Sequence, residues 1–186
     1  MSGFRLPALS VDQFCSKLGS VFVPATVMMQ IDAGLQSYLP SVPAGLPQKP
    51  DTVPDETAIL FWESPQTYWN GFTTLAVRTY TLTHNGVYIT ENQRSRADFP
   101  ALFTGALAID QPVCLFDKPA DWMHGSVSHL VGARPASQDP DAFRAAVTDA
   151  LGQIQRAVAL DGAIACVGSD YLVYWELGKS APGGRP

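Results

Sequence analysis

The chain has 186 residues, close to the length of one ordinary domain, with 46% hydrophobic and 16% charged side chains. This composition supplies enough apolar surface for a core and too little charge for a disordered acidic chain. Lys and Arg number 12 against 17 Asp and Glu, a formal net charge of −5, whereas binding to phosphate backbones depends on clustered cations. We therefore expect a soluble folded domain with no nucleic-acid partner.

Three cysteines, Cys15, Cys114 and Cys166, lie far apart and among apolar residues. Their odd number and wide spacing do not form a disulfide framework, and no CxxC pair is present, so we interpret them as buried thiols in a reducing compartment, the cytoplasm. Residues 1–9 contain no continuous apolar run, and no apolar window reaches the length that crosses a bilayer. We therefore expect neither a secretion signal nor a membrane partner.

The first predicted element is a short helix after Ser10, because Gln13 three residues later completes a capping-box pattern. Apolar residues then recur at helical spacing up to Gly19. Residues 21–31 are rich in Val, Thr, Phe and Met without a helical stripe, which predicts a mostly buried strand whose first part Pro24 confines to a sheet edge. Residues 35–39 fit one helical turn.

Prolines interrupt the next segment, and each lacks an amide donor and restricts the residue before it. We expect a loop or lid there, and not a boundary between large domains. Residues 57–63 form a short apolar run typical of a central strand. Ser64 and Pro65 then fit the N-cap and the first position of a helix over residues 66–72. The prolines of the loop are Pro40, Pro43, Pro47, Pro50 and Pro54.

Residues 73–90 allow two interpretations. Side chains alternate over residues 77–84, and the Asn85-Gly86 pair that follows precedes Val-Tyr-Ile-Thr, which is the strongest short-range hairpin signal in the chain. The alternative is a long helix from Pro65 to His84, which β-branched residues penalise without forbidding. We favour the hairpin.

The rest of the chain alternates strands and helices. Residues 94–105 predict a polar turn and then a short helix after Pro100, and residues 112–116 predict a brief strand. An apolar stripe that includes Phe143 and Leu151 predicts a helix that begins at Asp139-Pro140. Further strands are expected at residues 125–134, 163–168 and 171–177, giving the order strand, helix, strand, strand.

This order predicts an α+β fold, an antiparallel sheet with helices on one face. The run from Ile59 to Tyr68, a strand that leads through Ser-Pro into an aromatic helix, and the Phe143 helix with the strand at 171–177 make the layout resemble the ferredoxin-like fold. More narrowly, it resembles the dimeric α+β-barrel superfamily that includes antibiotic-biosynthesis-monooxygenase-like proteins. This resemblance implies a homodimer and a cofactor-independent oxygenase or isomerase-like activity.

We expect one α+β domain over residues 1–178 and a flexible tail over residues 179–186. A strand near Val21, a short helix and a strand near Ile59 loosely repeat the order of the last third, which suggests two related βαββ-type halves, residues 20–110 and 111–178. In related halves, the pairs Trp62-Glu63 and Trp175-Glu176 become equivalent strand ends, each Glu near a shared cavity or a subunit interface.

The densest cluster of reactive side chains is Asp117, Asp121, Trp122, His124 and, farther on, His129. A carboxylate beside an imidazole sets its tautomer and raises its basicity, so Asp121 and His124 are candidate catalytic residues. His124 and His129 are five residues apart and point to opposite faces of a regular strand, which disfavours a shared metal ion. The ordinary alternative is that the aspartates cap turns and one imidazole is exposed.

In the hairpin interpretation Arg78, Tyr80 and His84 share one strand face, and Tyr88 lies across from them. An arginine, a phenol and an imidazole on one wall suit an anionic or aromatic ligand. Arg78 and Tyr80 are therefore candidate ligand-binding residues, and His84 is a further catalytic candidate. The alternative is a solvated strand face with cross-strand aromatic packing, and a helix would separate these residues.

Aromatic side chains supply bulky walls for an apolar cavity, and Trp62, Tyr68 and Trp122 are the candidates for contact with a ligand. The alternative is that aromatic residues at strand or helix spacing belong to the core. The full set comprises Trp62, Tyr68, Trp69, Phe72, Trp122, Tyr171, Tyr174 and Trp175.

Two functions follow from these patterns. The sequence contains no GxGxxG, Walker, HExxH or GxSxG motif, so we expect no cofactor and no metal. The first hypothesis is a small-organic-ligand binding protein or a cofactor-independent enzyme with an apolar aromatic cavity. The alternative is a non-catalytic oligomerisation or protein-interaction module, in which aromatic surfaces pair subunits.

Overall fold

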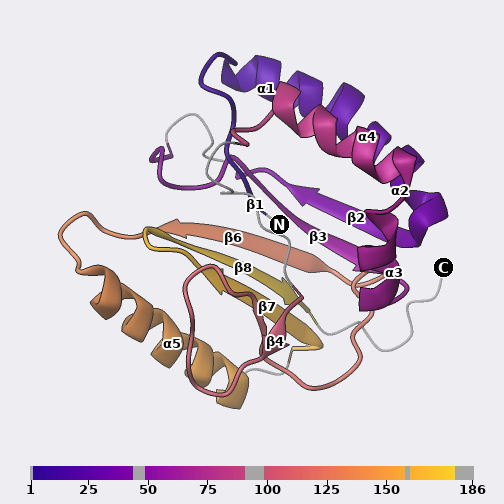
Figure 1. The fold of residues 1–186 in the computed structure, drawn as a ribbon. Coiled ribbons are helices and arrows are strands. Elements are labelled where there is room, and N and C mark those ends of the chain that lie inside the picture. The colour runs from indigo at the N-terminus through magenta and orange to yellow at the C-terminus, as the bar shows by residue number, and fades with distance from the viewer. Residues whose placement is uncertain (1, 44–48, 91–98, 158–159, 179–186) are drawn as a thin grey trace. The chain divides into compact units, whose positions relative to one another are not determined.

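Strands form two sheets in the computed structural model, which describes residues 2–43, 49–90, 99–157 and 160–178. One sheet has three strands and the other has five. The chain divides into two compact units: unit 1 comprises Met1–Lys49 with Pro54–Ala97, and unit 2 comprises Pro50–Val53 with Asp98–Pro186. Each unit combines a sheet with helices, so the predicted α+β class is confirmed (Figure 1).

Unit 1 contains one continuous helical run. The Ser10 side chain accepts a hydrogen bond from the Gln13 N–H, and the Gln13 side chain accepts one from the Ser10 N–H, so the predicted capping box is confirmed. The helix does not end at Gly19, and the strand predicted at residues 21–31 is wrong. The run consists of α1 (Val11–Lys17), the π-helical segment η1 (Leu18–Phe22), α2 (Val23–Gln30) and the 3₁₀ segment η2 (Ile31–Ala33).

Two features explain why a segment rich in Val and Thr is helical. Pro24 has no N–H to donate and crowds the preceding turn, and the wider π-helical segment just before it accommodates the ring. Phe22, Thr26 and Gln30 recur every four residues and are all buried, so they give the run an inward face. Packing of that face overrides the β propensity of the side chains.

The run Val11–Ala33 is 23 residues long, and by length and composition it is apolar enough to cross a membrane. The expectation that no segment reaches this length is therefore wrong. Signal sequences and the mostly buried core helices of folded units pass the same test, and 28% of this run's window is buried. Here Phe14, Leu18 and Phe22 of the run belong to the buried core of unit 1.

The strands of unit 1 are β1 (Ser2–Gly3), β2 (Leu35–Ser41) and β3 (Glu56–Trp62), in the antiparallel order β1-β3-β2. β3 confirms the predicted central strand, whereas β2 replaces the helical turn predicted there, which is wrong. Gly34, with φ of 99°, ends the helical run in the left-handed conformation and leads the chain into β2. Pro40 is tolerated because β2 lies at the edge of the described sheet.

α3 (Pro65–Gly71) confirms the helix predicted after Ser64, whose side chain accepts a hydrogen bond from the Thr67 N–H. α4 (Leu75–Thr83) and the 3₁₀ turn η4 (His84–Gly86) occupy the place of the predicted hairpin, which is wrong. The alternative of one long helix is also incomplete, because the chain leaves the helical path between α3 and α4.

The β-branched residues that favoured a hairpin form hydrogen bonds or are buried within or next to α4. Thr74 caps the helix by accepting a hydrogen bond from the Val77 N–H. The hydroxyls of Thr81 and Thr83 donate to backbone carbonyls one turn earlier. Val77 and Tyr80, three residues apart, are buried and form the inward face. The Asn-Gly pair therefore closes a helix end and does not reverse a strand.

Figure 1 shows α1, α2 and α4 over one face of the three-stranded sheet. α2 contacts α4, and α3 contacts η2 and β3. The core of this unit is mostly aromatic, which matters for the polar groups described below. It consists of Phe14, Leu18, Phe22, Tyr80, Val87 and Tyr88.

Unit 2 is built on the second sheet, whose strand order is β4-β5-β7-β8-β6. The strands predicted at β5, β6, β7 and β8 and the helix α5 are confirmed, whereas the short helix predicted after Pro100 is wrong. The Ala101 N–H donates to the Pro112 carbonyl and Phe103 is buried, so pairing of β4 with β5 prevails there. The elements are β4 (Ala101–Leu102), β5 (Val113–Cys114), β6 (Val127–Ala133), α5 (Pro140–Ala157), β7 (Gly162–Val167) and β8 (Tyr171–Leu177).

Each unit contains a β-α-β-β segment with the same strand order. In unit 1 β3 lies between β1 and β2, and in unit 2 β8 lies between β6 and β7. The two outer strands are therefore parallel, and the last strand is inserted antiparallel between them. The single domain over residues 1–178 and the related halves, 20–110 and 111–178, stay predictions. The tail predicted at residues 179–186 lies outside the described residues.

Replacing Gly34 should destabilise the end of the helical run. A Cβ at this position would lie 2.2 Å from the Thr67 Cγ2 atom, and the left-handed φ would be strained. We expect Gly34→Ala to lower the free energy of unfolding by about 1–3 kcal/mol, measured by chemical denaturation. Gly86→Ala is the matched control, because a Cβ there meets nothing within 4 Å. Equal losses in the two variants would contradict the assigned turn.

Candidate functional site

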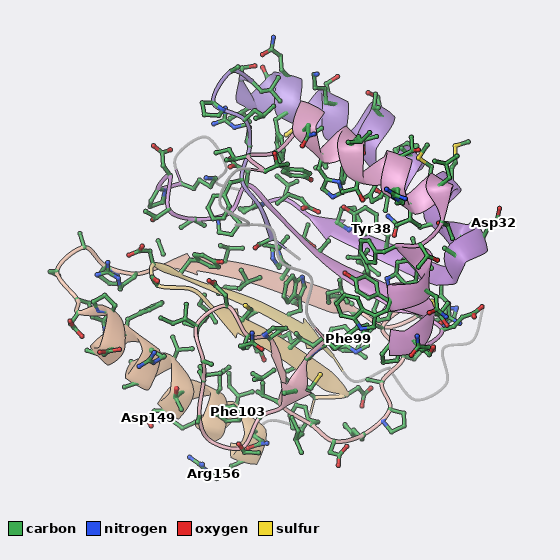
Figure 2. All side chains as sticks on the ribbon, viewed as in Figure 1. Asp32, Tyr38, Phe99, Phe103, Asp149 and Arg156 are labelled. Carbon is green, nitrogen blue, oxygen red and sulfur yellow. The ribbon has the colours of Figure 1, made fainter. Side chains whose placement is uncertain are left out.

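A carboxyl group lies buried under the helices of unit 1. Glu56 is the first residue of β3, and its exposed fraction is 0%. Its Oε1 atom accepts a hydrogen bond from the Tyr38 hydroxyl at 3.1 Å, and its Oε2 atom accepts one from the Tyr88 hydroxyl at 3.3 Å. Tyr38, labelled in Figure 2, comes from β2, and Tyr88 follows η4. Three separate segments therefore meet at the carboxyl group.

Packing on two sides holds the Tyr88 ring in place. Its centroid lies 5.9 Å from that of Phe14 and 5.1 Å from that of Phe22, both in edge-on geometry. On the β1 side, a Cβ at Gly3 would lie 2.3 Å from the Tyr88 ring, so only glycine permits this close approach. The hydroxyl is thereby fixed toward Glu56.

The surroundings of Glu56 favour its protonated form. Burial raises the pKa of Glu56 from its ordinary value of 4.5 to about 7, and the N-terminal amino group and the hydrogen bonds from Tyr38 and Tyr88 offset part of this effect. Burial and the nearby Glu56 charge raise the pKa of both phenols. Near neutral pH the carboxyl group exchanges a proton while the phenols stay protonated, which is a property of acid–base sites.

A second polar group adjoins the first. The hydroxyl of Tyr80, on α4, lies 3.0 Å from that of Thr26, which also bonds to the Phe22 carbonyl. Burial raises the pKa of Tyr80; hydrogen bonds from Thr26 and Gln30 lower it in part, and the Glu56 charge raises it further. Both groups are buried and the Glu56 charge couples them, so we call them together the buried network.

The predicted wall of Arg78, Tyr80 and His84 is not formed. On α4, Tyr80 and His84 are four residues apart and their ring centroids lie 4.9 Å apart, whereas Arg78 is exposed. Burial lowers the pKa of His84, whose Nδ1 atom lies 3.1 Å from the Thr81 carbonyl oxygen. The prediction relied on strand alternation, and a helix places Arg78 and Tyr80 on different sides.

Asp121 and His124 do contact each other, in an exposed turn of unit 2. The His124 Nδ1 atom lies 2.9 Å from Asp121 Oδ2, and the two side chains are 78% and 63% exposed. The Asp121 Oδ1 atom also accepts the backbone N–H of Met123 and of His124, as in an Asx turn. The hydrogen bond from His124 lowers the pKa of Asp121. A catalytic role for the pair stays a prediction.

The aromatic candidates of unit 1 form a cluster around α3. The Tyr68 ring is central, with centroid distances of 5.2 Å to Trp62, 4.9 Å to Trp69 and 5.0 Å to Phe72. The indole N–H of Trp62 is buried and has no hydrogen-bond partner among the described residues. Trp69 and Phe72 are exposed. Trp62 and Tyr68 are half-buried beside this outer pair, and their contact with a ligand stays a prediction.

The remaining candidates lie in unit 2. Trp122 packs over β7, where a Cβ at Gly162 would lie 2.8 Å from its ring. The His129 ring stacks on Trp175 with centroids 5.3 Å apart, and burial lowers the pKa of His129.

In the part of the chain that the structure describes, no three potential ligands gather to hold a metal ion. Cys15 is exposed, so the prediction of a buried thiol is wrong there.

The outward side of the unit 1 helices is apolar. Met28 lies two residues from both Thr26 and Gln30, hence on the opposite side of α2 from the buried face, and it is 76% exposed. Leu75 and Leu82 are two turns apart on α4 and are 80% and 66% exposed. We define the apolar helical face as these three residues together with Val21, Ile31, Trp69 and Phe72, all of them exposed.

These residues come from adjoining elements. A Cβ at Gly71, the end of α3, would lie 3.6 Å from Ala33 in η2 and 3.7 Å from Val77 in α4, so the three elements converge there. Residues 18–31 and α3 contain no charged side chain, and α4 contains only Arg78. The apolar helical face therefore has almost no charge within it.

No family model matches the sequence, and no match is found among curated proteins or among solved structures. The function of the chain is therefore inferred from its own geometry.

Sequence patterns did not identify Glu56 as a site residue. Its partners Tyr38 and Tyr88 are 18 and 32 residues away, so no local spacing links them. The available signal was the polar pair Thr26 and Gln30, four residues apart. With Phe22 one turn earlier, these residues indicate a helix face that needs buried polar partners.

Replacing Glu56 with Gln should change how stability depends on pH. The folded pKa, about 7, lies above the ordinary value of 4.5, so the folded chain binds this proton more tightly. The stabilisation is complete below about pH 4.5 and is lost as the pH rises to about 7. The wild-type loss should be on the order of 3 kcal/mol, and Glu56→Gln should abolish it, as measured by chemical denaturation across this range.

Two further variants make the result specific. Tyr38→Phe removes a hydrogen bond that lowers the pKa of Glu56, so the loss of stability should move to higher pH. Asp149→Asn, on the exposed side of α5 (Figure 2), is the charge-matched control and should behave as wild type. An unchanged pH dependence in Glu56→Gln would show that this carboxyl group does not set it.

Proposed function

We propose that the chain is an oligomerisation module and that its apolar helical face pairs with the same face of a second copy. The observation that carries this proposal is the exposure of large apolar side chains on adjoining helices of unit 1, with Leu75 80% and Met28 76% exposed. Large exposed apolar side chains on neighbouring elements are typical of interaction surfaces. The homodimer expected from the sequence agrees with this function.

The size of the face suits a stable dimer. A large apolar side chain buries on the order of 100 Å² when it is covered, so the apolar helical face offers several hundred Å². A standard interface buries about 800 Å² on each partner, and a rim of neighbouring residues supplies the remainder. The face is thus large enough to form the centre of such an interface.

The charges around the face favour a second copy over a membrane surface. Exposed charges of both signs occur on the segments next to the face, with Arg78 on α4, Asp32 in η2 and Glu63 just before α3 (Asp32 is labelled in Figure 2). In a twofold dimer identical patches meet, and a rim of both signs can be self-complementary. Attraction to an anionic bilayer instead requires a cationic rim.

Helix α5 of unit 2 offers an internal comparison. It also covers one face of a sheet, with Phe143, Val147 and Leu151 buried. Its outward residues include Asp149 and Arg156, which point away from the sheet in Figure 2. A helix that faces only solvent in this chain therefore carries charges, and the helices of unit 1 depart from that pattern.

We also propose the finer relationship to the ferredoxin-like fold, including two related halves. It is supported by the shared β-α-β-β strand order, which makes β3 and β8 correspond and brings Trp62-Glu63 and Trp175-Glu176 to corresponding strands. One difference stands. Trp62 packs on α3, whereas Trp175 faces away from α5, since its neighbour Tyr174 belongs to the α5 core.

A small-ligand or cofactor-independent enzyme function is the second candidate. The observation that favours it is the Glu56 carboxyl group, which exchanges a proton near neutral pH and accepts hydrogen bonds from two phenols. Arg78, the residue expected to bind an anionic ligand, lies outside this network. The oligomerisation module therefore has the stronger support.

Charged substitutions on the apolar helical face should dissociate the dimer. We expect wild-type chain to sediment as a dimer in analytical ultracentrifugation at micromolar concentration. Met28→Asp and Leu75→Asp should each weaken association on the order of 100-fold, because symmetry buries two unpaired charges. Both side chains are exposed in the single chain, so folding should be unaffected.

The matched control is Leu130→Asp, which alters another exposed leucine, 53% exposed on β6. It should leave the dimer intact. A wild-type monomer under these conditions would overturn the proposal, as would a dimer that only the Leu130 variant disrupts. Wild-type binding to phosphatidylcholine vesicles that is lost in Leu75→Asp would assign the face to lipid instead.

A further inference from the structure

The helices that carry the apolar helical face also cover Glu56. The helical run presents Phe22 (η1) and Thr26 (α2) inward and Met28 (α2) outward, and α4 presents Tyr80 inward and Leu75 outward. The outward residues can form a regular surface only while the inward residues hold both helices against β3. The buried network and the apolar helical face therefore lie on opposite sides of the same layer of helices.

Uncharged side chains approach the carboxyl group from β2, from α4, from the segment after η4 and from the helical run. β2 contributes the Tyr38 hydroxyl, the segment after η4 contributes Tyr88, and α4 contributes Tyr80. The helical run contributes Phe14 and Phe22, through the Tyr88 ring. None of the described lysine or arginine side chains forms an ion pair with Glu56.

Nearby cations are engaged elsewhere. Arg5 and Lys49 pair with Asp55, the residue before β3, at 3.4 Å and 3.3 Å. His84 contacts the Tyr80 and Tyr88 rings, not the carboxyl group, and its own pKa is lowered by burial. The N-terminal amino group lowers the pKa of Glu56, and its effect is smaller than that of burial. Charge on Glu56 is therefore only partly compensated.

We propose that the proton on Glu56 holds the helical layer of unit 1 (α1, η1, α2 and α4) against its sheet, and that loss of this proton loosens the layer and weakens self-association. A protonated carboxyl group donates to one phenol and accepts from the other, so both oxygens are satisfied without water. An ionised carboxylate needs solvation that two phenols supply only in part, and water enters only if the covering helices move. A looser layer must be reordered on docking, which reduces affinity.

This inference rests on the proposed function, and it specifies how the same face is regulated. The dimer should be favoured in mildly acidic solution and disfavoured in mildly alkaline solution. The group that senses pH, Glu56, does not itself contact the second copy, since its exposed fraction is 0%. pH then acts on the population of the docking-competent layer and not on contacts at the interface.

The test combines hydrogen exchange with sedimentation. Exchange in α1, α2 and α4, corrected for its intrinsic pH dependence, should rise about tenfold as the pH passes through neutrality, and the dimer dissociation constant should rise by a similar factor. Glu56→Gln should abolish both changes, whereas Asp149→Asn should retain them. Tyr38→Phe should move both changes to higher pH.

The monomeric variant Leu75→Asp separates the two proposals. If this variant shows the rise in exchange at neutral pH, and wild type does not dimerise at any pH, the effect of the Glu56 proton on the helical layer is supported and self-association is contradicted. If wild type dimerises equally at acidic and alkaline pH, or if Glu56→Gln keeps the rise in exchange, the proposed effect of the Glu56 proton is contradicted. Self-association through the apolar helical face is then unaffected.

Discussion

Burial of the Glu56 carboxyl group is the constraint on which the arrangement of unit 1 depends. A carboxyl group with an exposed fraction of 0% needs hydrogen-bond partners within the protein, and Tyr38 and Tyr88 provide them. Those partners fix the register of β2 and the chain path after η4. The helices must then cover the network, which explains why their inward face mixes Phe22 with the polar Thr26.

Burial of Glu56 also determines which residues of the helical run stay exposed. One side of the run, with Phe14, Leu18, Phe22, Thr26 and Gln30, is buried, so apolar residues on its other side, such as Met28 and Ile31, stay exposed. Only 28% of its most apolar 18-residue window is buried within the chain. A helix that is apolar all round is normally covered on all sides, so the exposed side of this run, with Met28 and Ile31, calls for a partner. In the proposed dimer, the same face of a second copy covers this side.

Local patterns predicted the elements whose signals were complete within a few residues. The Ser10 capping box, the Ser64 cap with Pro65 and the long stripe of α5 each combine a start signal with an apolar period. The predictions for residues 21–31 and 73–90 were wrong because they relied on the β propensity of β-branched residues. In the structure, Thr hydroxyls in both segments donate hydrogen bonds to backbone carbonyls of the preceding helical turn. The site was not predictable, because the Tyr38–Glu56–Tyr88 contacts join distant segments and exist only after both elements pack.

The choice of phenols as partners determines what Glu56 can do. A lysine or arginine in the same position would hold the carboxylate ionised at every ordinary pH, and the layer would have one state. Burial raises the pKa of Tyr38 and Tyr88, so the phenols stay neutral and do not compensate the charge of an ionised Glu56. With its own pKa near 7, the carboxyl group changes state in the range where small shifts in pH occur. A network that served packing alone would gain nothing from this arrangement, since a glutamine in the same place satisfies both phenols at any pH.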